Sequence, residues 1–436
     1  MESSKSRIAW FRNTAPYIKA HRGSTFILLL PGEAWAAGAL PALLHDIALL
    51  SSLGVRLVLV HGSRPQIDER LREAQIESRF AGGLRITENR MLPYLQQAGG
   101  AQRLALEALL SQSVPNSPMQ GADLRVGAGN HVIARPLGII DGLDHQFTGR
   151  VRRIDAAGIN TLLDAGSVVL LSAVGYSPTG EAFNLASEDV AISAARALDA
   201  DKLIVLGANS GVSINGELLR QCVADEAEAL SLQNPEQAAM LSVAARACRQ
   251  GVPRCHIVGY RDPDALLTEL FTTDGSGTLV TQRPFEQSRW ATIDDAGGIL
   301  ELLEPLEVAG VLLKRSRERL EAEIGQFRLL ERDGRITACA ALYPYADNSS
   351  AELACIVTHP EYQGEQRGKR LLGELEAVAL ERGLSEVFVL TTQTAHWFLE
   401  QGFVESSLDQ LPPARQALYN LQRNSKVFTK ALRGRT

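Results

Sequence analysis

Short apolar runs that alternate with stretches of helical spacing are the feature that most limits how the first part of this chain can fold. The runs lie at residues 25–30, 56–60, 168–171, 202–206 and 255–258, and several are rich in Val and Ile. Strands that alternate with helices form a mostly parallel sheet with helices on its faces. We therefore predict one α/β sandwich with a mainly parallel sheet, roughly 280 residues long.

The order of the predicted elements changes near residue 285. A strand and two helices precede three strands, of which the first two are joined at Asp333-Gly334, because an Asp-Gly pair favours a tight hairpin turn. The later elements are an amphipathic helix from Arg370, a strand at 386–392, a short helix at 395–403 and a closing strand at 425–432. Consecutive antiparallel strands after a helical start indicate an α+β domain. We therefore place a boundary between 281 and 289, which gives domains 1–283 and 284–436.

Composition and charge exclude several classes of protein. The chain has 44 Lys and Arg against 50 Asp and Glu, a net charge of −6, which does not favour binding to nucleic acid or to an anionic membrane. The longest apolar runs are far shorter than a membrane span, and the start has no apolar core of signal-peptide length. The five cysteines form no C-x-x-C pair and have no His at metal-ligand spacing. We expect a cytoplasmic protein with reduced thiols, no metal and no nucleic-acid or membrane partner.

Three stretches of the second domain resemble the GNAT (GCN5-related N-acetyltransferase) family. They are the strand ELACIVTHPEY (352–362), the loop and helix start at 363–372, and WFLEQGF (397–403). The pyrophosphate loop of the family reads R/Q-x-x-G-x-G/A, and here Gln366 replaces the first glycine. A loop that opens a helix aims backbone N–H groups and the helix dipole at an anion. The resemblance implies acetyl-CoA as co-substrate, bound by Ile356, Val357, Gln363, Gln366, Arg367, Gly368 and Lys369.

Glu352 stands in an apolar strand, where a carboxylate is costly to bury. It is either a surface residue or a residue with a chemical task, and the family resemblance implies a general base that takes the proton of the acceptor amine. The usual tyrosine acid of the family is absent, so Ser425 or Thr391 is left to orient or protonate the leaving thiolate. Cys355 is expected to be a small buried residue rather than a nucleophile.

Most of residues 15–282 resemble the amino acid kinase family, in its N-acetylglutamate kinase-like branch. Among the stretches that carry the resemblance are RLVLVHGSRPQID, RPLGIIDGLDHQFTGRVRRID and FNLASEDVA. The parts for phosphoryl transfer are missing, because Leu30-Pro31 stands where the family has a catalytic lysine, and Arg64-Pro65 stands where it has phosphate-binding glycines. Without cations and backbone donors on the phosphates, no kinase activity is expected.

The arginine-sensing site of feedback-inhibited members of that branch has matching positions in this chain. The resemblance implies an allosteric L-arginine site made of Tyr17, Lys202, His256, Glu269, Gly275 and Gly277. Glu269 can form an ion pair with a guanidinium, and the carbonyl oxygens of the glycine loop can accept hydrogen bonds from the fixed N–H donors of that guanidinium. The alternative is a solvated helix residue followed by a plain glycine turn.

Together the two domains resemble the bacterial N-acetylglutamate synthase family. That resemblance implies transfer of acetyl from acetyl-CoA to the α-amine of L-glutamate, the first step of arginine biosynthesis, in a homo-oligomer inhibited by L-arginine. The two carboxylates of glutamate need cationic donors. The family implies Arg315 and Arg423, assisted by Ser425 and the backbone near Cys355. An arginine sensor without turnover and an acetyltransferase for another amine are the two alternatives.

Overall fold

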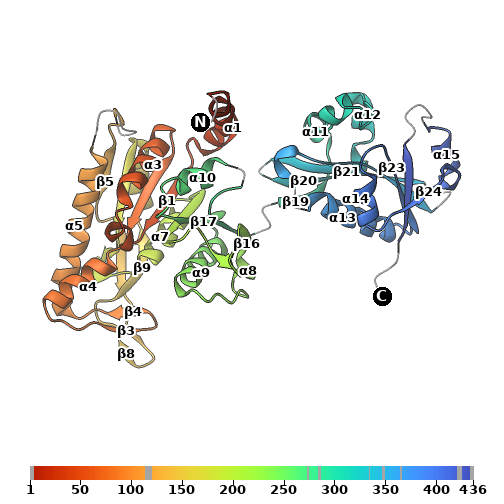
Figure 1. The fold of residues 1–436 in the computed structure, drawn as a ribbon. Helices are drawn as coiled ribbons and strands as arrows, with labels where there is room; N and C mark the ends of the chain where they lie inside the picture. The colour runs from red at the N-terminus through yellow and green to blue at the C-terminus, as the bar shows by residue number, and fades with distance from the viewer. Residues whose placement is uncertain are drawn as a thin grey trace. The chain divides into compact units, whose positions relative to one another are not determined.

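The computed structural model describes residues 4–112, 120–272, 274–282, 286–332, 334–345, 349–363, 366–419 and 425–432. Residues 4–11, 13 and 361 are described by their backbone alone. The chain divides into two compact units, Met1–Pro284 and Phe285–Thr436, and each has its own sheets and core (Figure 1).

The first unit is built on an eight-stranded sheet in the order β16-β18-β17-β13-β1-β2-β10-β5. All neighbouring strands pair in parallel except β17 and β18, so the predicted mainly parallel sheet is confirmed. The strands in sheet order are β16 (Gln221–Val223), β18 (Thr278–Thr281), β17 (Arg254–Gly259), β13 (Lys202–Gly207), β1 (Thr25–Leu30), β2 (Arg56–His61), β10 (Ser167–Ser172) and β5 (Arg125–Ala128).

Helices cover both faces of this sheet, which explains why its central strands are apolar throughout rather than alternating. Along β1, Phe26 and Leu28 pack beneath α3, α5 and α10, whereas Ile27 and Leu29 pack beneath α6, α7 and α9. The helices are α1 (Ser4–His21), α2 (Glu33–Ala36), α3 (Leu40–Ser52), α4 (Arg64–Glu73), α5 (Leu92–Leu110), α6 (Ala156–Asp164), α7 (Ser187–Ala197), α8 (Ala224–Ala227), α9 (Pro235–Arg249) and α10 (Ala265–Phe271).

A second, four-stranded sheet in the order β12-β11-β6-β9 was not predicted from the sequence. Its strands are short and mix polar with apolar residues, so no local period marks them. They are β6 (Val132–Pro136), β9 (Gly149–Ile154), β11 (Val174–Tyr176) and β12 (Ala182–Asn184). Three small hairpins complete the unit: β3 (Arg79–Ala81) with β4 (Leu84–Ile86), β7 (Ile139–Ile140) with β8 (Leu143–Asp144), and β14 (Ser213–Ile214) with β15 (Glu217–Leu218).

The second unit is a seven-stranded sheet in the order β19-β20-β21-β22-β23-β25-β24, which confirms the predicted α+β domain. Only β22 and β23 pair in parallel. Helix α13 packs on one face and α11 on the other. The strands are β19 (Glu286–Trp290), β20 (Phe327–Arg332), β21 (Arg335–Tyr345), β22 (Ser350–Thr358), β23 (Glu386–Thr391), β24 (Val404–Ser406) and β25 (Lys426–Ala431). The helices are α11 (Ala296–Val308), α12 (Arg317–Ala322), α13 (Arg367–Glu381), α14 (Ala395–Glu400) and α15 (Pro413–Gln416).

In the described part of the chain, no helix combines the length and the apolar character that a membrane crossing requires.

Candidate functional site

Strand β22 contains a β-bulge at its centre. Ala341 on β21 pairs with Ala354, and Cys339 pairs with Val357, so β22 has one more residue than β21 between these two pairs. Cys355 lies in this interval with a φ of +51°, a left-handed conformation that non-glycine residues rarely adopt. Backbone strain of this kind is typical of functional sites, where the surrounding structure holds it in place.

The bulge changes which side chains of β22 face which helix. In a regular strand Leu353 and Cys355 would share a face, because side chains alternate. Here Leu353 packs in the apolar cluster with α13, and Cys355 packs in the cluster with α11. The bulge therefore brings the Cys355 side chain to the α11 face, while Ile356 turns toward the α13 cluster.

Strands β22 and β23 stop pairing just before this bulge. Their parallel pairing runs from Ser350 with Glu386 to Glu352 with Phe388 and ends there, although both strands continue. Strand β23 goes on pairing with β25 as far as Thr391. The bulged half of β22 therefore presents its backbone to a V-shaped gap in the sheet, the position at which an extended ligand can hydrogen-bond to a strand.

The start of α13 lies beside the bulge. Gln366 precedes the helix with φ +57° and ψ +16°, the left-handed conformation that glycine adopts freely, and its side chain is exposed. The first bond within the helix is donated by the N–H of Arg370 to the carbonyl oxygen of Gln366 at 2.9 Å. A Cβ on Gly368 would lie 3.4 Å from the Trp397 ring and 3.9 Å from Ile356. The helix start, β22 and α14 thus meet around Gly368.

The predicted acetyl-CoA residues do not all point the same way. Gln363 and Lys369 are exposed, but the Arg367 guanidinium is buried and forms an ion pair with Glu286 at 2.5 Å. Gln366 replaces a family glycine without changing the backbone conformation that glycine favours. Gln366 therefore takes the left-handed backbone conformation before α13 despite the altered motif.

Glu352 forms a bidentate ion pair with Arg415 of α15. Arg415 Nε lies 2.6 Å from Glu352 Oε2, and Nη2 lies 3.1 Å from Oε1. The two side chains are 13% and 14% exposed. Glu352 is therefore not the solvated surface carboxylate that the sequence left open, and its orientation is fixed from a segment 63 residues away.

Arg315 lies in the loop between α11 and α12, where it is largely buried. The nearby groups that act on its charge include Cys355, Tyr343 and Glu323, and although burial lowers its pKa, the net shift is upward. Its Nε is buried and has no hydrogen-bond partner within the described residues. A buried guanidinium N–H without an acceptor is costly, and a ligand carboxylate would supply one.

Cys355 has the properties of a structural residue. Burial raises the pKa of its thiol to about 11, so the thiol is protonated near neutral pH. This argues against a covalent acetyl-enzyme on Cys355.

The two candidate hydroxyls lie at neighbouring strand ends, because Thr391 ends β23 and pairs with Lys426, the first residue of β25, which Ser425 directly precedes. The Thr391 Oγ accepts hydrogen bonds from the N–H groups of Gln393 and Thr394, which cap the turn into α14. The Ser425 carbonyl accepts from the Tyr419 hydroxyl at 2.7 Å. Arg423 lies outside the described residues.

In the first unit, a cavity of about 120 Å³ lies at the carboxyl ends of β1 and β2. Its lining includes Gly32, Gly62 and Arg64. A Cβ on Gly32 would lie 2.8 Å from both Pro65 Cδ and Gln66 Oε1, and Gln66 Nε2 donates to the Gly32 carbonyl at 2.9 Å. Side chains therefore pack against the Gly32 backbone, where a kinase needs room for phosphates.

The predicted arginine-sensing residues Glu269 and His256 form a buried pair. His256 Nδ1 lies 2.6 Å from Glu269 Oε1, and Oε2 accepts from the N–H groups of Ser276 and Gly277, each at 2.8 Å. Burial lowers the pKa of His256, which favours the neutral ring, and the carboxylate beside Nδ1 favours the tautomer with the proton on Nδ1. The other ring nitrogen, Nε2, is then an acceptor, and it is buried without a partner in the described residues. An unpaired buried acceptor favours a ligand with N–H donors.

The two glycines allow this arrangement. A Cβ on Gly275 would lie 2.4 Å from Glu269 Oε2, and one on Gly277 would lie 2.1 Å from the Ile257 carbonyl oxygen. The carbonyl oxygens of Asp274 and Gly275 both accept from Arg220 Nη1. The loop thus already binds one guanidinium through its carbonyls.

Lys202 and Tyr17 complete the predicted set. Lys202 is buried at the start of β13 and lies close enough to His256 for its charge to lower the pKa of that ring. Tyr17 is half-buried on α1, and its ring centroid lies 6.4 Å from that of His21. His21 Nε2 hydrogen-bonds to the Leu270 carbonyl at 2.8 Å, which ties α1 to α10 (Figure 1). No local pattern in the sequence singles out His21.

Within the described ranges, no cluster of three or more His, Cys, Asp or Glu side chains is arranged to hold a metal ion.

Two family models match this chain. The amino acid kinase family matches residues 24–259, and the acetyltransferase (GNAT) family matches residues 298–403. The fold and the diverging strands therefore define the class, a GNAT acetyltransferase domain that follows an amino acid kinase domain.

Full-length relatives give the family. An amino-acid acetyltransferase of Azotobacter vinelandii is 55% identical over 430 residues, covering 98% of this chain and 99% of the relative. One of Pseudomonas fluorescens is 54% identical over 428 residues, with the same coverage. The crystal structure of N-acetylglutamate synthase from Neisseria gonorrhoeae complexed with coenzyme A and L-arginine is similar with a TM-score of 0.89 and 37% identity, over 98% of this chain and 99% of that one. The chain belongs to the amino-acid acetyltransferase family, which confirms the resemblance noted in its motifs, and it is an acyltransferase.

Proposed function

We propose that the protein transfers acetyl from acetyl-CoA to the α-amine of L-glutamate and that L-arginine inhibits it by binding the first unit. The observation that carries the acetyl-CoA assignment is the divergence of β22 from β23 beside the start of α13. The Neisseria gonorrhoeae synthase, a relative of similar fold, has been crystallised with coenzyme A and with N-acetyl-glutamate, which supports the same ligands here.

The pantetheine arm would extend along the free edge of β22, and its carbonyl and amide groups would bond the backbone around Ile356 and Val357. The pyrophosphate would meet the N–H groups of Gly368 and Lys369 at the positive end of α13. Gln363 and Gln366 remain proposed parts of this loop.

Glutamate would lie on the α11 face of β22. The unpaired Arg315 Nε supports a carboxylate at that position, and Arg423 and Ser425 are proposed to bind the other end of the substrate. Cys355 would contribute its backbone, which has a left-handed conformation at the bulge.

The reaction would run through a ternary complex. Glu352, fixed by Arg415, takes a proton from the amine, directly or through water, and the nitrogen attacks the thioester carbonyl. Backbone N–H groups of β22 stabilise the oxyanion, the C–S bond breaks, and coenzyme A leaves as thiolate. Ser425 and Thr391 are the candidates that orient or protonate it.

Binding of L-arginine would use the buried pair in the first unit. Three of the roughly four acceptor positions of the Glu269 carboxylate are occupied, so one remains for a guanidinium. The unpaired Nε2 of His256 offers a second acceptor. Phosphoryl transfer is not part of the proposal. We further propose a cytoplasmic homo-oligomer, and the five free, buried cysteines support a reducing compartment.

The test is release of coenzyme A thiol by the purified full-length protein, with L-glutamate and with other amino acids as acceptors. Turnover on glutamate that falls when L-arginine is added is expected, and Glu269→Gln should weaken that inhibition at least tenfold without lowering the uninhibited rate. Turnover only with another amine would overturn the glutamate assignment. Turnover insensitive to arginine would overturn the regulatory one.

A further inference from the structure

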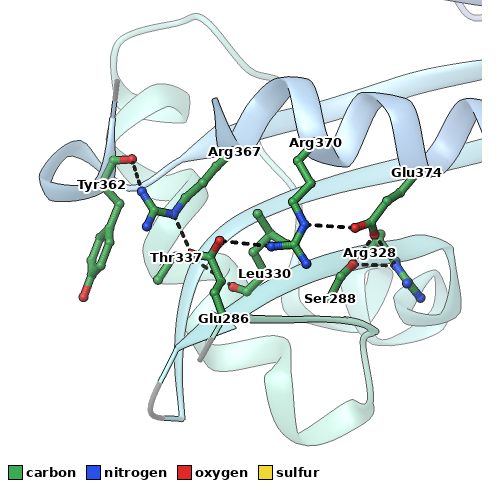
Figure 2. Close-up of polar contacts among 9 residues, drawn as sticks. All are labelled: Glu286, Ser288, Arg328, Leu330, Thr337, Tyr362, Arg367, Arg370 and Glu374. Carbon is green, nitrogen blue, oxygen red and sulfur yellow. Dashed lines mark hydrogen bonds and ion pairs between the residues drawn. The ribbon is translucent and has the colours of Figure 1, made fainter. Parts of the chain in front are cut away.

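Arg367 is oriented differently from its neighbours on α13. It is the first residue of the helix, and its guanidinium points into the domain, with 6% of the side chain exposed (Figure 2). Its Nε donates to Glu286 Oε1 at 2.5 Å, and its Nη1 donates to the Tyr362 carbonyl oxygen at 2.8 Å. Lys369 and Arg370, by contrast, are exposed.

These contacts connect the two ends of one loop. Tyr362 comes just before Gln363, and Arg367 comes just after Gln366, so the Arg367 side chain ties the residue after the loop to the residue before it. The guanidinium also lies 5.2 Å from the centroid of the Tyr362 ring. Because the guanidinium fork is planar and rigid, it fixes the direction of both contacts as well as their length. The direction of the backbone N–H groups that follow Arg367 therefore depends on the position of this guanidinium.

Glu286 holds the guanidinium in place. It is the first residue of β19, its side chain is 11% exposed, and it also accepts from Thr337 Oγ1 on β21 at 3.1 Å. Its second oxygen lies 3.4 Å from Arg370 Nη1 (Figure 2). If Glu286 lost its charge, the buried Arg367 would lose this ion pair, and its guanidinium would be held less firmly.

We infer that Glu286 is a positioning residue for acetyl-CoA, which acts through Arg367 to fix the direction of the backbone N–H groups at the start of α13. The inference rests on the proposed acetyl-CoA site. Arg367 forms an ion pair with Glu286, and backbone N–H groups of α13 bind the pyrophosphate.

Arg367 could instead contact the pyrophosphate directly. The two roles predict opposite changes in the affinity for coenzyme A when Glu286 is neutralised. If Arg367 contacted the ligand, removal of the Glu286 charge would leave more positive charge for the pyrophosphate and would tighten binding. If Arg367 instead holds the start of α13 in place, the same change releases the helix start and weakens binding. The sign of the change therefore separates the two roles.

The experiment compares Glu286→Gln and Arg367→Lys with the wild type as full-length proteins. Binding of coenzyme A is measured by calorimetry, and the KM for each substrate and kcat are measured by thiol release. We expect Glu286→Gln to raise the Kd for coenzyme A and the KM for acetyl-CoA about tenfold, with kcat and the KM for glutamate within twofold. Arg367→Lys should act in the same direction, because one ammonium group does not reproduce both contacts of the fork.

Glu374→Gln is the matched control. Glu374 lies on the same helix and contacts Arg370 and Arg328, but not Arg367 (Figure 2). This variant should leave the Kd for coenzyme A within twofold. An unchanged or lower Kd in Glu286→Gln would overturn the inference, and so would an equal rise in Glu374→Gln, which would indicate a general effect of charge loss on α13. Wild-type protein that binds no coenzyme A would instead refute the proposed function.

Discussion

The ion pair between Glu352 and Arg415 allows a prediction with a magnitude. Two charge-assisted hydrogen bonds join the side chains, at 2.6 and 3.1 Å, and both groups are at least 86% buried. Removing one partner of such a pair leaves an uncompensated charge and costs about 3–5 kcal/mol. We expect Arg415→Gln to lower the free energy of unfolding of the second unit by that amount. In the double variant with Glu352→Gln, the loss should be about 2–3 kcal/mol smaller than the sum of the two single losses.

The assay is a double-mutant cycle measured twice, by urea unfolding and by kcat. Loss of the general base should lower kcat by about 10²–10⁴-fold. Because Arg415 acts through Glu352, adding Arg415→Gln to Glu352→Gln should cost little further activity. A coupling energy below about 0.5 kcal/mol would show that the pair behaves like an exposed one and would refute the reasoning from burial. Losses of kcat that multiply would show that Arg415 has a separate role.

Three further predictions concern the backbone and the buried titratable groups. Gln366→Gly should raise the free energy of unfolding by about 0.5–1 kcal/mol, and with it the melting temperature, because the left-handed φ of +57° is strained for Gln. The same substitution should not raise the KM for acetyl-CoA. Burial lowers the pKa of His21 and of His61 to about 4. The free energy of unfolding of the first unit should therefore be highest above pH 6.5 and should fall toward pH 4, by up to about 3 kcal/mol per histidine. Urea unfolding at several pH values measures this free energy, and a flat profile would contradict the prediction. Burial raises the pKa of Asp46 to about 7, so its effect on stability has the opposite pH dependence to that of the two histidines. Asp46→Asn should raise the free energy of unfolding at pH 8 by about 2–4 kcal/mol, and it should make that free energy fall more steeply with decreasing pH below pH 6.5.

Local patterns in the sequence singled out several of the proposed site residues. A carboxylate in an apolar strand singled out Glu352, and the loop motif singled out the start of α13, because both signals lie within a few consecutive residues. The partners of these residues were not predictable in the same way. Arg415 is 63 residues from Glu352 in an ordinary polar stretch, and Glu286 is 81 residues from Arg367. No spacing in the sequence marks such pairs.

The sequence by itself determined the mainly parallel α/β class of the first unit, the α+β class of the second, and the faces of the main strands and helices that must be buried. These follow from hydrophobic periodicity, which each segment carries within itself. Tertiary structure alone decided the bulge at Cys355, the divergence of β22 from β23, and the inward turn of Arg367. Register and ion pairing depend on which distant segments become neighbours, and only the folded chain makes them neighbours.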